Sequence, residues 1–234
     1  MKKPDKKRIG ILGGISYEST IKYYSIIHSE YYSKFYNYDF PEVIIFSLNF
    51  GKVIDLEHNK DDKTSYINYL HKGIQALERA GAQVILMAAN SVHSIYNELK
   101  DLANIPILSI VHVTGNKARK LGLKKVLLLG IKLTMQSNFY QNYFKEIEID
   151  LITPSLEEQN RIDNIIFQEL VRGDFKEESK SEILGIIHNY DVDGVILGCT
   201  ELPLIIYSED LEIRVLNTLK LHALAGLNFS LRSE

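Results

Sequence analysis

The sequence predicts an α/β protein made of two pseudo-symmetric domains, each a parallel sheet flanked by helices. Short apolar runs rich in isoleucine and valine alternate with segments whose apolar residues recur every three or four positions. The pattern of strand, glycine turn and helix also occurs twice along the chain. Such alternation favours parallel strands joined by right-handed helical crossovers.

The apolar runs have the length and composition of β-strands. They span residues 8–12, 43–48, 83–88, 105–110, 125–129, 148–152, 194–197 and 213–216. Between them, two amphipathic helices are marked by apolar stripes at Ile67, Leu70, Ile74 and Leu77 and at Val92, Ile95, Leu99 and Leu102. We expect the last helix, residues 219–231, to return to the first half.

The internal repeat sets the expected domain boundaries. Gly13-Gly14 followed by Ser19-Thr20 recurs loosely as Gly130 followed by Thr134-Met135, and residues 84–90 resemble residues 194–200 at an offset that pairs Ala89 with Cys199. We therefore expect one domain at 1–113 with 217–234 and another at 114–216. No low-complexity linker separates them, so they should pack closely and form a cleft.

Composition excludes several function classes. The chain has 234 residues, 45% of them hydrophobic and 24% charged, and a net charge of −3. The basic residues are scattered along the chain except for an N-terminal cluster of Lys2, Lys3, Lys6, Lys7 and Arg8. This cluster is expected to be a solvated tail. Since no sustained basic face is predicted, no nucleic-acid partner is expected. No apolar run approaches the ~18 residues of a membrane span. Because charged residues lead directly into the first predicted strand, no signal peptide is expected. A single cysteine cannot form an internal disulfide, which fits a reducing compartment and predicts a cytoplasmic protein. The cysteine and histidine residues do not have the spacing of a zinc site, so no metal is expected.

That single cysteine, Cys199, is the predicted chemical centre. It follows the apolar strand at 194–197, and ligands gather at the carboxyl ends of parallel strands. A helix is expected to start at this position, and its N-terminal amides should lower the thiol pKa below about 8.5. A cysteine that only fills the core would have apolar neighbours, whereas Thr200 and Glu201 place polar groups beside this sulfur.

Four segments together resemble the aspartate/glutamate racemase family. They are residues 9–20, residues 89–93, Gly130 with Thr134-Met135, and Gly198-Cys199-Thr200-Glu201. The resemblance implies two pseudo-symmetric α/β domains with the active site at their interface, usually in a homodimer, and no pyridoxal phosphate, metal or other cofactor. In this family a cysteine thiolate from one half removes the α-proton and a cysteine thiol from the other half returns one.

The resemblance also implies roles for individual residues. Cys199 is the acid/base of the second half. Asn90, Ser91 and Thr200 hold the substrate α-carboxylate and amino group, and the backbone at Ala89 and Glu201 completes the wall. Ile15 touches the substrate, and Glu57 lines the site from the loop after the second strand. For Asn90 and Ser91, helix capping ahead of Val92 is an equally good interpretation.

The sequence departs from the family at Ala89, which stands where the first-half cysteine is expected. A methyl group neither accepts nor donates a proton, so a two-thiol mechanism is excluded. Either another group serves that face, or the reaction needs one cysteine, or activity is lost. Ser91 and His93 are the nearest replacements, although a histidine there is more often a core hydrogen-bonding residue. Relatives that decarboxylate malonate-type acids resemble this chain in keeping only the second-half cysteine.

The resemblance implies an acidic amino acid or a related dicarboxylate as the substrate, and a broader or neutral substrate is the alternative. No lysine or arginine occurs at residues 49–51, where one is expected for an aspartate side chain; Lys52, Arg161 and Arg172 are possible substitutes or simply surface charges. The sequence thus predicts an isomerase, a cofactor-independent racemase of aspartate, glutamate or a related amino acid. The alternatives are a single-cysteine decarboxylase-type lyase and a catalytically silent ligand-binding protein.

A tyrosine-rich segment lies on a predicted helix and in the turn that follows it. Its members are Tyr23, Tyr24, Tyr31, Tyr32, Tyr36 and Tyr38. Packing or a dimer face explains these rings better than a stacking platform for bases.

Overall fold

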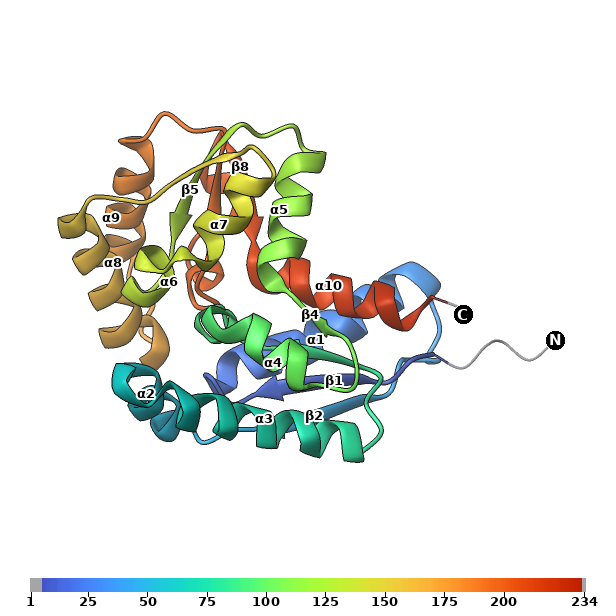
Figure 1. Cartoon of the computed structure of the whole chain (residues 1–234). Helices are drawn as coiled ribbons and strands as arrows, with labels where there is room; N and C mark the ends of the chain where they lie inside the picture. The colour runs from blue at the N-terminus through green and yellow to red at the C-terminus, as the bar shows by residue number, and fades with distance from the viewer. Residues whose placement is uncertain (1–5, 233–234) are drawn as a thin grey trace. The chain divides into compact units, whose positions relative to one another are not determined.

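The computed structural model describes residues 6–232, except for the side chain of Lys60, so Lys2 and Lys3 of the basic cluster lie outside the described residues. The chain divides into two compact units. One holds the residues up to Ser109 together with those from His222 onward, and the other holds residues 110–221. Each unit contains its own four-stranded parallel sheet (Figure 1).

In the first unit the strand order is β2-β1-β3-β4. The strands are β1 (Ile9–Gly13), β2 (Val43–Ser47), β3 (Val84–Met87) and β4 (Ile107–Leu108). The helices are α1 (Tyr17–Phe35), α2 (Phe50–His58), α3 (Lys63–Arg79), α4 (Tyr96–Leu102) and most of α10 (Thr218–Ser230), with the 3₁₀ turns η1 (Lys60–Asp62) and η2 (Ser91–Ile95).

Helices cover both faces of this sheet. Ile85 and Met87 pack with Leu70 and Ile74 of α3, whereas Leu86 between them lies against α10 at Gly226. Alternate residues of one strand therefore enter two different cores. This explains why β3 is apolar throughout rather than alternating between apolar and polar.

In the second unit the strand order is β6-β5-β7-β8. The strands are β5 (Lys125–Leu129), β6 (Asp150–Ile152), β7 (Gly194–Leu197) and β8 (Arg214–Asn217). The helices are α5 (Ile110–Lys120), α6 (Lys132–Gln136), α7 (Asn138–Glu146), α8 (Leu156–Gln168) and α9 (Glu177–His188), with the 3₁₀ turns η3 (Leu170–Arg172), η4 (Leu202–Leu204) and η5 (Ser208–Asp210). Equating β1 with β5 makes the two strand orders identical, which confirms the predicted pseudo-symmetric α/β fold.

The observed elements differ from the predicted ones where apolar runs continue past a strand. The run at 105–110 forms only the two-residue strand β4, and Ile110 already begins α5, because a buried apolar residue suits either element. The helix predicted at 92–102 starts as the 3₁₀ turn η2. Among the described residues, no helix combines the length and apolar character needed to cross a membrane.

A buried histidine joins three elements of the first unit. His222 of α10 is fully buried, and its Nε2 lies 2.9 Å from the carbonyl oxygen of Leu108 at the end of β4. Because a carbonyl only accepts, Nε2 carries the proton, and Nδ1 then accepts from the hydroxyl of Tyr23 on α1 at 2.8 Å. Burial, with a smaller contribution from His93, lowers the pKa of His222 from 6.5 to about 3.

The lowered pKa predicts a loss of stability in acid. Between pH 6.5 and about 3 the unfolded chain binds a proton at His222 that the folded chain does not bind, so stability falls as the pH falls. Lowering the pH from 7 to 5 should reduce the free energy of unfolding by about 2 kcal/mol through this group. Urea titrations at both pH values should show a smaller decrease in His222→Gln than in the wild type.

The matched control for this experiment is His188→Gln, which changes an exposed histidine at the end of α9. The control should retain the wild-type decrease in stability. An equal decrease in His222→Gln and the wild type would contradict the assignment of a neutral buried imidazole at His222.

Candidate active site

Cys199 lies two residues beyond the end of β7, a central strand that pairs with β5 and β8. Every residue of β7 is buried. Cys199 is itself 8% exposed and lies in the apolar cluster formed with α8 and α9. The sulfur therefore stands at the carboxyl edge of the second sheet, as the sequence predicts, in surroundings that exclude most water.

The Cys199 thiol has a charged partner in these surroundings. Its Sγ donates to Oε2 of Glu201 at 3.0 Å, and the Thr200 hydroxyl donates to the same oxygen at 2.9 Å. Thr200 and Glu201 are both buried. Oε2 of Glu201 thus accepts two hydrogen bonds, from Cys199 and from Thr200. The sulfur therefore has the polar neighbours that the sequence predicts.

The prediction of a lowered thiol pKa is wrong for this structure. Burial, followed by the negative charge of Glu201 and its hydrogen bond, raises the pKa of Cys199 well above its ordinary value. The backbone amides of Glu201 and Leu202 act in the opposite direction but more weakly. The residues after Cys199 form only the short 3₁₀ turn η4, so no α-helix begins at the sulfur.

Thr134 is a further candidate, because it carries an unpartnered buried polar group. The residue is fully buried in α6, and its Oγ1 has no hydrogen-bond partner. Its side chain packs against the backbone of both glycine turns, since a Cβ placed on Gly130 or Gly198 would lie 3.2 or 3.4 Å from Thr134 atoms. The sequence identifies Thr134 only as part of a motif, because whether a hydroxyl has a hydrogen-bond partner depends on the three-dimensional structure.

In the first unit, the turn after β1 holds Ile15 in a buried position. Gly14 adopts a left-handed φ of 81°, and a Cβ there would lie 2.4 Å from the carbonyl oxygen of Leu48, so the turn requires glycine. The Gly14 amide donates to the Thr20 hydroxyl, and the side chain of Ser16 caps α1. Ile15 is packed in the apolar core next to this turn.

Ala89 occupies the position in the first unit that Cys199 occupies in the second. It lies two residues beyond β3, as Cys199 does beyond β7. Asn90 and Ser91 follow it and are buried. Neither supports the capping interpretation, because Asn90 makes no side-chain cap hydrogen bond to η2 and Ser91 already belongs to that turn.

His93 is engaged within its own segment. Its Nδ1 lies 2.9 Å from the carbonyl oxygen of Ala89, so Nδ1 carries the proton and donates to that carbonyl. The ring stacks on Tyr96 and lies edge-on to His222. His93 is only 2% exposed, and these contacts favour a structural role over proton relay.

Glu57 differs from its predicted setting. It lies within α2 rather than in a loop, because Asn49 caps that helix soon after β2 and the chain is helical from Phe50. Its Oε1 accepts a hydrogen bond from the Tyr66 hydroxyl of α3 at 2.8 Å. Burial, with the negative charge of Glu57, raises the pKa of Tyr66 well above its ordinary range. Glu57 therefore links two helices.

The basic residues considered for substrate binding have other contacts. Lys52 lies over the ring of Tyr69 at 4.6 Å from its centroid. Arg161 pairs with Glu157 on α8 at 2.6 Å, and Arg172 donates to Gln168 at 2.9 Å. All three side chains belong to exposed positions, which favours the interpretation as surface charges.

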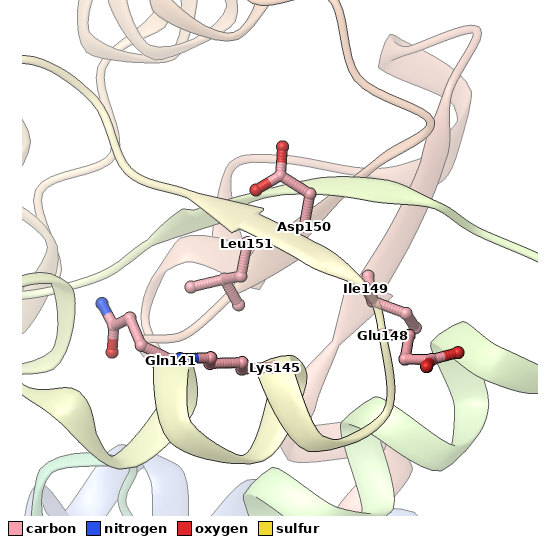
Figure 2. Close-up of a pocket in the computed structure, with 6 residues that line it drawn as sticks. All are labelled: Gln141, Lys145, Glu148, Ile149, Asp150 and Leu151. Atoms are coloured by element: carbon pink, nitrogen blue, oxygen red, sulfur yellow. The ribbon is translucent and has the colours of Figure 1, made fainter.

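Two further kinds of binding feature are relevant here, a metal site and a pocket. Among the described residues, no group of three or more histidine, cysteine, aspartate or glutamate side chains could hold a metal ion. A pocket of about 370 Å³ lies between α7 and β6 and is lined by Gln141, Lys145, Glu148, Ile149, Asp150 and Leu151. In Figure 2 the Leu151 side chain points toward α7, whereas the Asp150 carboxylate points away from it. None of the predicted site residues lines this pocket.

Comparison with known proteins places these features in a family context. Residues 12–225 match the family model described as Asp/Glu/Hydantoin racemase. A glutamate racemase from Exiguobacterium sibiricum is 25% identical over 134 residues, 56% of this chain and 49% of that protein. The broad specificity amino-acid racemase RacX of Bacillus subtilis is 30% identical over 142 residues, 58% of this chain and 60% of that protein. The chain thus matches about half to three fifths of the lengths of these relatives.

The matches to two solved structures cover almost the whole length of both chains. An aspartate racemase homologue from Pyrococcus horikoshii has a TM-score of 0.86 and 36% identity, and the match covers 97% of this chain and 100% of that one. The aspartate racemase of Picrophilus torridus has a TM-score of 0.79 and 25% identity, with coverage of 96% and 94%.

The Cys199–Glu201 pair predicts the reactivity of the thiol. Removing the negative charge in Glu201→Gln should lower the pKa of Cys199 and increase its thiolate fraction. Each pKa unit of lowering should raise the thiolate fraction about tenfold at pH 8 and accelerate alkylation by iodoacetamide about threefold, because a less basic thiolate is also a weaker nucleophile. Since Cys199 is the only cysteine, label incorporation measured by mass spectrometry reports this sulfur alone.

The matched control for alkylation is Glu209→Gln, which neutralises an exposed glutamate of the same segment. This control should react at the wild-type rate. Equal rates in Glu201→Gln and the wild type would show that the carboxylate does not hold the thiol proton.

Proposed function

Since the chain belongs to the Asp/Glu/Hydantoin racemase family, we propose that it is a cofactor-independent amino-acid racemase with Cys199 as its acid/base. Its substrate is aspartate, glutamate or a related small amino acid. Relatives with racemase names support this proposal, as does the family resemblance of the sequence at residues 198–201. The proposal includes the finer features that the resemblance implies, namely independence from pyridoxal phosphate, a cytoplasmic location and a homodimer.

The observation that carries the proposal is the hydrogen bond from the buried Cys199 thiol to Glu201. In the resting protein the raised pKa keeps the proton on sulfur, so Cys199 is ready to donate it. To act as a base, the S–H bond breaks and the proton moves to Glu201 Oε2, which forms an O–H bond and leaves a thiolate. The thiolate then accepts the α-proton of the substrate, and the electron pair of that C–H bond remains on the α-carbon as a carbanion.

Low solvent access explains why such a weak carbon acid could react here. A thiolate in water is stabilised by hydration, whereas one formed in this apolar cluster keeps its basicity. The developing charge on the substrate carboxylate needs hydrogen-bond donors. The unpartnered Thr134 hydroxyl is the donor that we assign to it in the second unit. The Thr200 hydroxyl becomes a second donor once the proton received by Glu201 Oε2 displaces the hydrogen bond from Thr200.

In the first unit we assign the substrate wall from the family resemblance. Asn90 and Ser91 contribute polar side chains, the backbone at Ala89 continues the wall, and Ile15 contributes an apolar contact. Their buried positions after β3 and β1 support this assignment. Glu57 has the weaker support, because its carboxylate accepts from Tyr66.

A second candidate function is favoured by one observation, the methyl group of Ala89. A decarboxylase-type lyase needs one cysteine to protonate a planar enediolate, whereas inversion of an α-carbon needs an acid/base on each face. Carbon dioxide release from a malonate, with no α-proton exchange on any amino acid, would favour the lyase. Tight binding of a dicarboxylate without turnover would favour a silent binding protein.

Deuterium wash-in tests the role of the sulfur. In heavy water, aspartate, glutamate and other amino acids should gain one deuterium at the α-carbon in the presence of the wild-type protein, as measured by mass spectrometry. Cys199→Ser should reduce this rate at least about 100-fold, because a hydroxyl is a far weaker acid and base than a thiol. The control Ser208→Ala, an exposed change in the same segment, should keep the wild-type rate.

Retained exchange in Cys199→Ser, with unchanged circular dichroism, would contradict the assignment of Cys199 as the acid/base. Absence of exchange in the wild type on every amino acid would remove the racemase proposal itself.

Restoring a thiol at residue 89 should increase inversion relative to exchange. The resemblance assigns the first-half acid/base to this position, so Ala89→Cys should raise the rate of D-isomer formation at least about tenfold, as measured by chiral chromatography. Ala89→Ser is the matched control, because it adds a polar atom of similar size without a comparably acidic proton. Equal inversion rates in Ala89→Cys and the wild type would show that residue 89 is not this position.

A further inference from the structure

His93 lies in η2, directly after the residues that form the proposed substrate wall of the first unit. Its Nδ1 donates to the carbonyl oxygen of Ala89 at 2.9 Å, and its backbone amide donates to the carbonyl oxygen of Asn90 at 3.0 Å. η2 is a 3₁₀ helix, whose backbone amides bond to the third residue back. The imidazole reaches one residue further and so ties the beginning of the wall to η2.

Two other histidines make the same kind of side-chain bond, but in a different setting. Nδ1 of His28 lies 2.8 Å from the carbonyl oxygen of Tyr24 in α1, and Nδ1 of His58 lies 2.8 Å from that of Ile54 in α2. In an α-helix the backbone already bonds each residue to the fourth residue back, so these imidazoles add little to the path of the chain. The amide of His93 bonds to Asn90 instead, so here the imidazole supplies the longer bond itself.

Two neighbouring aromatic rings fix the orientation of the His93 ring. Tyr96 stacks on it with the centroids 6.0 Å apart, and His222 lies edge-on at 5.7 Å. The Tyr96 hydroxyl donates to the carbonyl oxygen of Ile107 at 3.1 Å, and Nε2 of His222 donates to that of Leu108 at 2.9 Å. Ile107 and Leu108 are the two residues of β4. The strand therefore holds both rings, and the two rings hold the buried imidazole between them.

The direction of the Ala89 carbonyl determines the direction of the next amide. A peptide group is planar and trans, so the C=O of Ala89 and the N–H of Asn90 point in opposite directions. Because the C=O is directed at His93, the N–H of Asn90 lies on the other side of the turn. The buried side chains of Asn90 and Ser91 extend from the chain that follows this peptide group. Their placement thus depends on the bond from His93.

We propose that His93 is a positioning residue for the proposed reaction, because its bond to the Ala89 carbonyl fixes the peptide group from which the Asn90 and Ser91 wall continues. This inference rests on the proposed function. In this role His93 transfers no proton, and its Nδ1 hydrogen stays bonded to Ala89. The wall holds the substrate carboxylate and amino group before and during proton transfer, so losing its placement weakens binding of the ground state and the transition state equally.

Kinetics of deuterium exchange with three variants of residue 93 test this role, using aspartate or glutamate, whichever the wild type exchanges faster. His93→Leu removes the donor and should raise KM at least about tenfold with kcat within about threefold of the wild type, because uniform binding is lost. His93→Asn should return KM to within about threefold of the wild-type value, since its amide nitrogen takes the place of Nδ1. His93→Gln should not, because its longer amide reaches the place of Nε2.

The comparison of these variants separates positioning from packing. All three lose the ring contacts with Tyr96 and His222, so a merely structural role would change KM equally in His93→Leu and His93→Asn. His28→Leu is the matched control, because it removes the same kind of bond from α1; its KM and kcat should equal those of the wild type. An unchanged KM in His93→Leu, or an equal increase in His93→Leu and His93→Asn, would overturn the proposal.

The geometry of the turn can be measured without catalysis. In a triple-resonance spectrum the carbonyl carbon of Ala89 is observed through the amide of Asn90. Its chemical shift should change in His93→Leu and return toward the wild-type value in His93→Asn, because the carbonyl loses and regains a hydrogen-bond donor. An unchanged shift in His93→Leu would overturn this inference alone, whereas absence of exchange in the wild type would remove the proposed function and the kinetic role with it.

Discussion

The burial of β1 and β3, and of β5 and β7, on both sheet faces is the constraint on which the rest of the structure depends. These central strands contain apolar residues or glycine at every position except Lys125, the first residue of β5, because a side chain buried on either face must be apolar. Polar groups are therefore confined to the turns at the carboxyl ends. Glycine at Gly14, Gly130 and Gly198 then lets the turns pass close to neighbouring backbone.

Sequence pattern predicted most of this architecture because burial on two faces leaves a strong signal. The strands at 125–129 and 194–197 have the predicted bounds, and the identical strand order explains the repeat. The pattern did not predict the element type where a buried apolar residue suits a strand and a helix equally well. Ile110 continues an apolar run but belongs to a helix, because hydrophobicity indicates burial and not backbone conformation.

The candidate site was predictable where its members are neighbours in sequence. Cys199, Thr200 and Glu201 share a hydrogen-bonded cluster because they are consecutive, and their turn follows directly from a buried strand. The direction of the Cys199 pKa shift was not predictable, because it depends on how deeply the carboxylate and the thiol are buried together. Likewise, the contact of Glu57 with Tyr66 depends on two helices packing, and the unsatisfied hydroxyl of Thr134 depends on what surrounds it.

The two halves share a backbone but differ in chemistry at one position. Ala89 and Cys199 lie equally far beyond β3 and β7, yet one presents a methyl group and the other a thiol with a carboxylate partner. His93 donates its Nδ1 proton to the carbonyl of Ala89 itself, which favours a structural role for this histidine. Proton transfer by Cys199 alone exchanges the α-proton with retention, whereas inversion requires a donor on the opposite face. Under the proposed function, exchange faster than inversion is the consequence of this asymmetry.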